Sequence, residues 1–207
     1  NFAYSHLDES GFLKNNNVQR DNFSLGGNSQ LTEKLSISST FNFVRSEFET
    51  PPTGSGTGNN SAGGPSVFAN LYFTPTNIDL TNWPYQHPVT GANVYYRNTN
   101  GITNPRWVLN NAKQTSNTNR FFSNIAVNYQ LTDWMKLTYR LGLDTYSEKQ
   151  TYELQKGSVG YPTDAALLSN GLFRTTNVTN TIVDHSAIAS FQKKISSNLE
   201  FNGLVGF

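Results

Sequence analysis

The sequence has 207 residues, of which 36% are hydrophobic and only 14% are charged, and its formal net charge is +1. Soluble domains usually carry about 25% charged residues, and a net charge this small gives no basic surface for nucleic acid. The absence of cysteine excludes disulfides, thiolate metal ligands and a cysteine nucleophile within these residues.

The first predicted elements are a strand fragment at the start of the chain and a hairpin from Val18 to about Glu47. Successive side chains of a strand point to opposite faces, and every second residue of both arms is largely apolar. A short polar turn from Thr32 to Lys34 joins the arms, as expected of a hairpin. The apolar positions are Phe23, Leu25, Leu31, Leu35, Ile37, Phe41 and Phe43.

The segment 48–118 is predicted to be a long loop with two parts. The first part is rich in Gly, Ser and Asn and has nothing apolar to pack. The second part is rich in Tyr, Trp and Pro, and a loop of this length usually carries function or folds on itself. Aromatic rings stack on sugars or on peptide side chains, and arginines hold acidic groups. Unless these rings form a small core of the loop itself or pack under a protein that covers the loop, the candidate substrate-binding residues are Trp83, Tyr85, Tyr95, Tyr96, Arg97 and Trp107.

The second hairpin, over residues 119–146, is the strongest signal in the chain. Each arm runs past ten residues, whereas strands of soluble domains usually have about five or six. A tilted strand that crosses a bilayer needs about 9–11 residues, so the pattern predicts a transmembrane β-barrel. The turn lies at residues 132–134. The apolar face is Phe121, Ile125, Val127, Tyr129, Leu131, Met135, Leu137, Tyr139, Leu141 and Leu143.

A second long loop is predicted over about 149–176, and a third hairpin follows from about Thr179 to Phe207, with its turn near Lys193 and Lys194. Short turns therefore alternate with long loops, and outer-membrane barrels have short periplasmic turns and long external loops. The pattern gives about seven strands, while closed bacterial barrels have even numbers. Both ends also stop within alternating runs, so we expect a piece of a larger barrel from a longer polypeptide.

Nothing in the sequence indicates an enzyme or a cofactor. The histidines His6, His87 and His185 are far apart, and none has a second ligand at metal-binding spacing. There is no G-x-S-x-G motif for a serine nucleophile. Tyr129 and Trp134 flank the second turn, where the interpretation we favour is an interfacial aromatic belt rather than a ligand contact.

Two stretches resemble the barrel of the SusC/RagA-type TonB-dependent transporters of the Bacteroidetes. They are residues 5–43, with the Gly11 turn and the strand entry RDNF, and residues 104–149, with NPRW as the entry into the strand and then the hairpin TDWMKLTYRLG. The resemblance implies an outer-membrane barrel of about 22 strands with a plugged lumen. It also implies import of oligosaccharides or peptides beneath a SusD-like surface lipoprotein, driven by TonB–ExbB–ExbD. The plug and the TonB-contacting segment of that family are not in this sequence.

Two other functions stay open at this point. One is a non-transporting outer-membrane barrel, such as a porin or an adhesin-like protein. The other is a secreted glycan-binding β-sandwich, which would show strands of about five or six residues and apolar faces packed on each other. In the barrel interpretation the polar face of the second hairpin lines the lumen. Its residues Arg120, Asn124, Arg140 and Asp144 then line the transport path, or pair with each other or with the plug.

Overall fold

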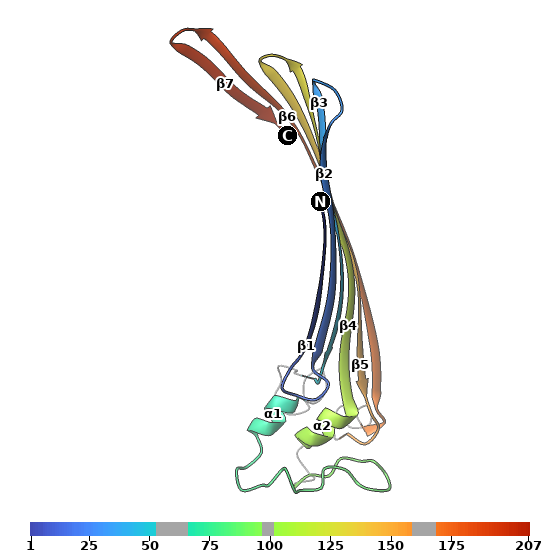
Figure 1. The fold of residues 1–207 in the computed structure, drawn as a ribbon. Coiled ribbons are helices and arrows are strands. Elements are labelled where there is room, and N and C mark those ends of the chain that lie inside the picture. Colours follow the sequence, from blue (N-terminus) through green and yellow to red (C-terminus); the bar gives the residue numbers. More distant parts are fainter. Residues whose placement is uncertain (53–65, 97–101, 159–168) are drawn as a thin grey trace.

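A computed structural model describes residues 1–52, 66–96, 102–158 and 169–207. Its main feature is one open antiparallel sheet of seven strands in sequential order, which is the predicted fold class (Figure 1). The strands are β1 (Phe2–Ser10), β2 (Asn17–Gln30), β3 (Leu35–Thr50), β4 (Ala112–Thr132), β5 (Met135–Leu154), β6 (Leu172–Ser196) and β7 (Leu199–Gly206). Two short helices, α1 (Val67–Tyr72) and α2 (Pro105–Asn111), lie between β3 and β4.

The strands are far longer than those of soluble domains. The five central ones, β2 to β6, have 14, 16, 21, 20 and 25 residues, against a usual five or six. The described helices have six and seven residues, whereas a helix that crosses a bilayer needs about 20.

The register gives the sheet one apolar and one polar face. Directly opposed residues of antiparallel strands share a face, and Phe23 lies opposite Phe43, which lies opposite Phe121. The apolar rows continue through Ile125 and Leu141. No second layer covers this face, since Phe43 keeps 39% of its surface exposed and Leu141 keeps 37%. The β-sandwich alternative is therefore wrong for the described residues.

The apolar side chains form a band of limited height. On β3 the band runs from Leu35 to Phe43, and the next residues on the same face are Arg45, Glu47 and Glu49. At about 3.4 Å per residue and a tilt of about 40°, this stretch is roughly 20–25 Å tall. The lipid-facing band of an outer-membrane barrel has about that height. We call it the apolar band.

Aromatic rings border the apolar band at both ends, as the belt interpretation predicts. At the end near the short turns, the Trp134 ring stacks on Phe191 with centroids 6.2 Å apart. At the other end Tyr4 and Phe23 lie 4.8 Å apart. Such rings have an apolar body and a polar edge, which suits the boundary between hydrocarbon and water.

Two predicted boundaries need correction. The loops predicted over 48–118 and 149–176 are shorter, because β3 continues to Thr50, β4 begins at Ala112, β5 ends at Leu154 and β6 begins at Leu172. These strand extensions lie beyond the apolar band. On the face that carries the band, their residues are mainly polar. They lack the alternation that reveals a strand in a sequence.

The third turn also lies later than predicted. Lys193 pairs with Phe201 and Lys194 with Glu200, so β6 continues through both lysines and turns at residues 197–198. The Lys193 ammonium lies 5.4 Å from the centre of the Trp134 ring. Long lysine side chains can stay in a strand at the edge of a membrane because the apolar stem lies along the surface while the ammonium reaches water. The turns between β2 and β3 and between β4 and β5 lie as predicted.

Candidate functional site

The described part of the connection between β3 and β4 folds into a unit, which we call the loop unit, at the end of the sheet opposite the short turns (Figure 1). Helix α2 begins where the side chain of Asn104 accepts a hydrogen bond from the backbone N–H of Arg106 and Pro105 takes the first helical position. This start directs Trp107 and Val108 inward. The buried core of the unit consists of Val67, Trp107, Val108, Ala112, Tyr152 and Leu154.

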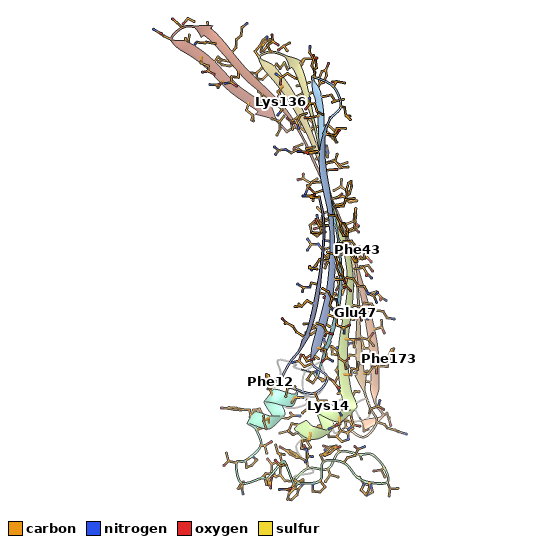
Figure 2. All side chains as sticks on the ribbon, viewed as in Figure 1. Phe12, Lys14, Phe43, Glu47, Lys136 and Phe173 are labelled. Atoms are coloured by element: carbon orange, nitrogen blue, oxygen red, sulfur yellow. The ribbon has the colours of Figure 1, made fainter. Side chains whose placement is uncertain are left out.

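The register shows on which face of the sheet the loop unit packs. Ala112 lies opposite Leu154, and Leu154 lies opposite Leu172, all on the polar face. Figure 2 agrees, since Phe43 and Phe173 of the other face point away from the side where α1 and α2 lie. The β1–β2 connection joins the unit through Lys14, whose ammonium donates to the side-chain oxygen of Asn110 at 2.8 Å. The loop unit therefore lies over the polar side of the sheet.

Two of the predicted substrate-binding residues are interior residues of this unit. Trp107 is 0% exposed, and its indole N–H donates to the Gly91 carbonyl at 2.9 Å. Tyr95 is 5% exposed, its hydroxyl bonds the Thr74 hydroxyl, and its ring meets the Tyr96 ring edge-on at 4.5 Å. Neither Trp107 nor Tyr95 presents a free ring face. Trp107 belongs to the small core that the sequence left as the alternative, and Tyr95 is buried in the same unit.

Arg106 holds the segment that carries the exposed aromatics. One of its guanidinium nitrogens donates to the carbonyls of Leu80 and Thr81, both at 2.7 Å, and to that of Trp83 at 3.3 Å. The guanidinium also lies 4.8 Å from the centre of the Tyr85 ring, an arrangement that adds a cation–π attraction. A side chain with fixed planar donors can thus order a loop that has no strand or helix of its own.

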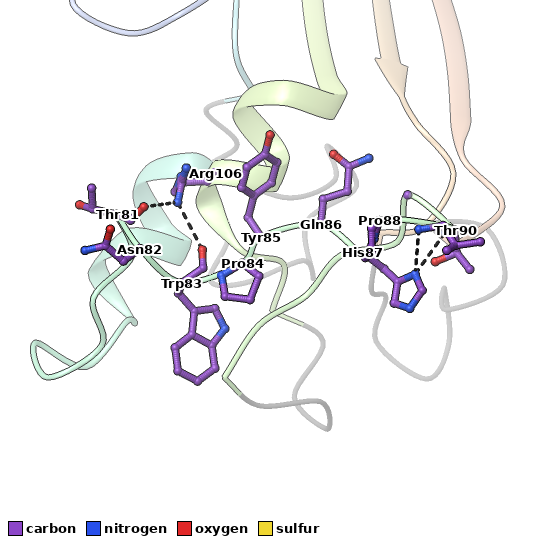
Figure 3. Close-up of a pocket in the computed structure, with 12 residues that line it drawn as sticks. Thr81, Asn82, Trp83, Pro84, Tyr85, Gln86, His87, Pro88, Thr90 and Arg106 are labelled. Atoms are coloured by element: carbon purple, nitrogen blue, oxygen red, sulfur yellow. Dashed lines mark hydrogen bonds between the residues drawn. The ribbon is translucent and has the colours of Figure 1, made fainter.

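A hollow of about 830 Å³ lies along the ordered segment, lined by residues 81–91 and Arg106 (Figure 3). Trp83 lines it and keeps 39% of its surface exposed. The Nδ1 atom of His87 accepts hydrogen bonds from the backbone N–H groups of Val89 and Thr90, at 3.3 and 3.2 Å. A neutral His87 ring therefore carries its proton on Nε2. No lining residue is acidic. We call this hollow the loop groove.

A turn beside the loop groove is fixed by Asp79. Its carboxylate accepts hydrogen bonds from the backbone of Thr81 at 2.9 Å and from the backbone and side chain of Asn82 at 3.2 and 2.7 Å. These bonds, led by the one from the Asn82 side chain, lower the pKa of Asp79 below its ordinary value. The turn positions Thr81 and Asn82 at one end of the groove.

The predicted site residues are thus only partly brought together. Trp83 and Tyr85 line the loop groove, Tyr95 and Trp107 are interior, and half-buried Tyr96 lies against Tyr95. Arg97 lies outside the described residues. Sequence reasoning missed His87, which lines the groove, and Asp79, which fixes the turn beside it. The stretch DLTNWPYQHP, with an Asp three residues before Asn82 and two prolines, is a turn signal that points to them.

On the polar face of the sheet, two of the predicted lumen residues pair with each other. Arg120 donates two hydrogen bonds to the Asp144 carboxylate, at 2.9 and 2.5 Å. The same guanidinium lies 5.2 Å from the centre of the Phe122 ring. Of the alternatives that the sequence left open, this pair supports mutual pairing. The described residues contain no group of three or more His, Cys, Asp or Glu side chains that could hold a metal ion.

Comparisons with known proteins support the fold alone. No protein-family model matches the chain, and no curated protein matches it. One match is a chain in a structure of the RagAB peptide importer in the closed-closed state. The match covers 99% of this chain and 22% of the importer chain, with a TM-score of 0.65 and 14% identity. A structure of the RagAB peptide transporter matches 99% and 22%, with a TM-score of 0.66 and 15% identity. The chain spans about a fifth of the length of the chains that it matches, and its sheet has the fold of that part of them.

Proposed function

We propose that this chain is part of the barrel wall and external loops of a TonB-dependent importer in the bacterial outer membrane. It catalyses no reaction and needs no cofactor. The ligand class is oligosaccharides or peptides. Its partners are a SusD-like surface lipoprotein, which covers the external loops, and TonB–ExbB–ExbD, which acts through a plug region that this sequence does not contain.

The observation that carries the proposal is the apolar band on one face of an open sheet. Its rows are exposed, yet they are too regular and too long for the surface of a soluble protein. Acyl chains can solvate such a face, and the polar face then looks into a water-accessible lumen. The two solved structures of the same fold are described as a peptide importer and a peptide transporter, which supports transport rather than adhesion.

The position of the loop unit fits ligand capture. Because its core packs on Ala112, Tyr152 and Leu154 of the polar face, the unit leans over the lumen and not over the lipid. The loop groove then lies at the external mouth of the barrel. Trp83 offers an exposed ring for stacking, and the bonds of Arg106 to the backbone reduce the ordering that ligand binding would otherwise require.

The experiment is an uptake assay with the product of the complete gene in its own bacterium. Labelled peptide and oligosaccharide pools are offered to the wild type, a gene deletion and a strain without TonB. We expect the uptake of ligands from one of the two pools to require both the gene and TonB. Trp83→Ala should raise the half-saturating ligand concentration about fivefold, since ring stacking contributes about 1 kcal/mol beyond area burial. Phe173→Ala is the matched control, an exposed ring (70%) on the opposite face of the sheet. Uptake that is independent of the gene or of TonB would refute the proposal.

A further inference from the structure

The lipid-facing side of the sheet continues well beyond the apolar band. On β4, β5 and β6, two successive rows of this face consist of polar residues, and the register places the residues of each row side by side. Asn119, Ser147 and Thr179 form the lower row, and Asn117, Lys149 and Asn177 form the upper row. We call these six residues the outer-wall patch.

The chemistry of the outer-wall patch is one ammonium among amides and hydroxyls. No carboxylate is among its six residues. Directly opposed side chains start about 5 Å apart and successive rows about 7 Å apart, so the patch has the size of a sugar ring with its substituents. Lys149 is the cation at its centre, with Asn117 and Asn177 opposite it on the two neighbouring strands.

The other strand cations on this side of the outer wall already have acidic partners. Arg45 pairs with Glu47, and the Lys113 ammonium lies 3.2 Å from the Glu49 carboxylate. Lys149 makes none of the ion pairs found within the described residues. The acidic residues on this side of the sheet lie mostly on β1 to β3. An anion that contacts this side is therefore attracted most strongly to Lys149.

The height of the patch selects the kind of anion. The highest row of the apolar band holds Phe43 and Phe121, which lie level with Thr145 of β5, and Lys149 lies four positions further along β5. At about 3.4 Å per residue and a tilt of about 40°, Lys149 stands roughly 10 Å above the band. The headgroup layer of a phospholipid leaflet is only about 5–8 Å thick. Lys149 therefore lies above phospholipid phosphates, at a height that only a larger headgroup reaches.

We propose that the outer-wall patch binds the phosphorylated sugar headgroup of an outer-leaflet glycolipid. Lys149 pairs with a phosphate, and the amides and hydroxyls of the two rows bond sugar hydroxyls. The inference rests on the proposed function, because that function places this face of the sheet in the outer leaflet. It adds a binding site on the outside of the wall, separate from the ligand path on the polar face.

The test measures glycolipid bound to the complete protein, extracted in detergent and examined by native mass spectrometry. Rough-type lipopolysaccharide of the host is the probe, with phosphatidylglycerol and inorganic phosphate as the comparison anions. We expect Lys149→Gln to lower bound lipopolysaccharide about tenfold, as the loss of one charge-assisted contact implies. Lys149→Arg should restore it. Lys136→Gln, on the same strand but on the polar face, should leave it unchanged.

Two results would overturn the inference. One is equal lipopolysaccharide binding by the wild type and Lys149→Gln, and the other is equally effective competition by phosphatidylglycerol or phosphate. Fractionation and uptake of the same strains separate this failure from that of the proposed function. A protein that stays in the outer membrane and imports its ligand, but shows no effect at Lys149, refutes the glycolipid site alone. A protein outside the outer membrane refutes both.

Discussion

Replacing Trp107 should unfold the external loop unit while leaving the sheet intact. The side chain is fully buried, and truncating a buried Trp to Ala costs about 3–5 kcal/mol. Trp107→Phe keeps most of the ring volume but leaves the Gly91 carbonyl without its donor, a loss of about 1–3 kcal/mol. The sheet contributes Ala112, Tyr152 and Leu154 to this core, all from the ends of β4 and β5 next to the loop unit. The ladders between the strands do not depend on this core.

Hydrogen–deuterium exchange of the complete protein in detergent measures this effect segment by segment. A loss of about 3 kcal/mol speeds exchange through local opening by roughly a hundredfold. Peptides from residues 66–96 and 105–111 should show that change in Trp107→Ala and a smaller one in Trp107→Phe. Peptides from the middle of β4 and β5 should exchange as in the wild type. Trp83→Ala is the matched control, because Trp83 lies on the surface of the same unit.

Either of two outcomes would refute the reasoning. If loop peptides of Trp107→Ala exchange at the wild-type rate, Trp107 is not the centre of a core. If β4 and β5 lose protection together with the loop, the loop unit and the sheet form one cooperative unit and our division between them is wrong.

Two further predictions concern the apolar band and the loop turn. Ile125→Arg should lower the unfolding free energy of the barrel in lipid vesicles by about 2–4 kcal/mol. Asn124→Arg, one residue away on the polar face, should lower it far less. Equal losses would contradict the assignment of the faces. The pKa of Asp79 is lowered in the folded loop, so its contribution to stability is present above the ordinary Asp pKa of about 3.9 and is lost as the pH falls through the lower folded value. Amide hydrogen exchange in the loop, corrected for intrinsic rates, should therefore become faster below about pH 4 in the wild type. The increase should be smaller in Asp79→Asn, because the amide oxygen of Asn can still accept the backbone hydrogen bonds. Equal increases in the two proteins would show that Asp79 is not responsible.

The sequence predicts the alternating part of the fold well, since in the proposed membrane setting lipid and water impose opposite demands on adjacent residues. Phe121 and Arg120 could not exchange faces there without burying charge in lipid, and the alternation is broken at few positions, such as Phe122 on the polar face. Beyond the apolar band water contacts both faces, and residues such as Asn117 and Thr118 carry no information on which side they face. For this reason the strand extensions were not predictable, although they hold Asn117 and Lys149 of the outer-wall patch.

The loop was predictable in kind but not in detail. Its aromatic content indicated an ordered unit, yet nothing in a count of rings distinguishes Trp107, which closes the core, from Trp83, which faces the groove. The capping pattern of Asn104 and Pro105 was the available signal, because it starts a helix and places Trp107 on its inner side. The bonds of Arg106 to three carbonyls are tertiary contacts that no local pattern reveals.

Lipid contact at the apolar band is the central claim, and fluorescence quenching by nitroxide-labelled lipids tests it most directly. This chain has no cysteine, so single cysteines that carry a small fluorophore can be placed at Leu141 and at Arg140 in a cysteine-free form of the complete protein. In vesicles we predict strong quenching at position 141 and little at its neighbour 140, since adjacent residues point to opposite faces. Equal quenching at the two positions, or stronger quenching at 140, would contradict the account.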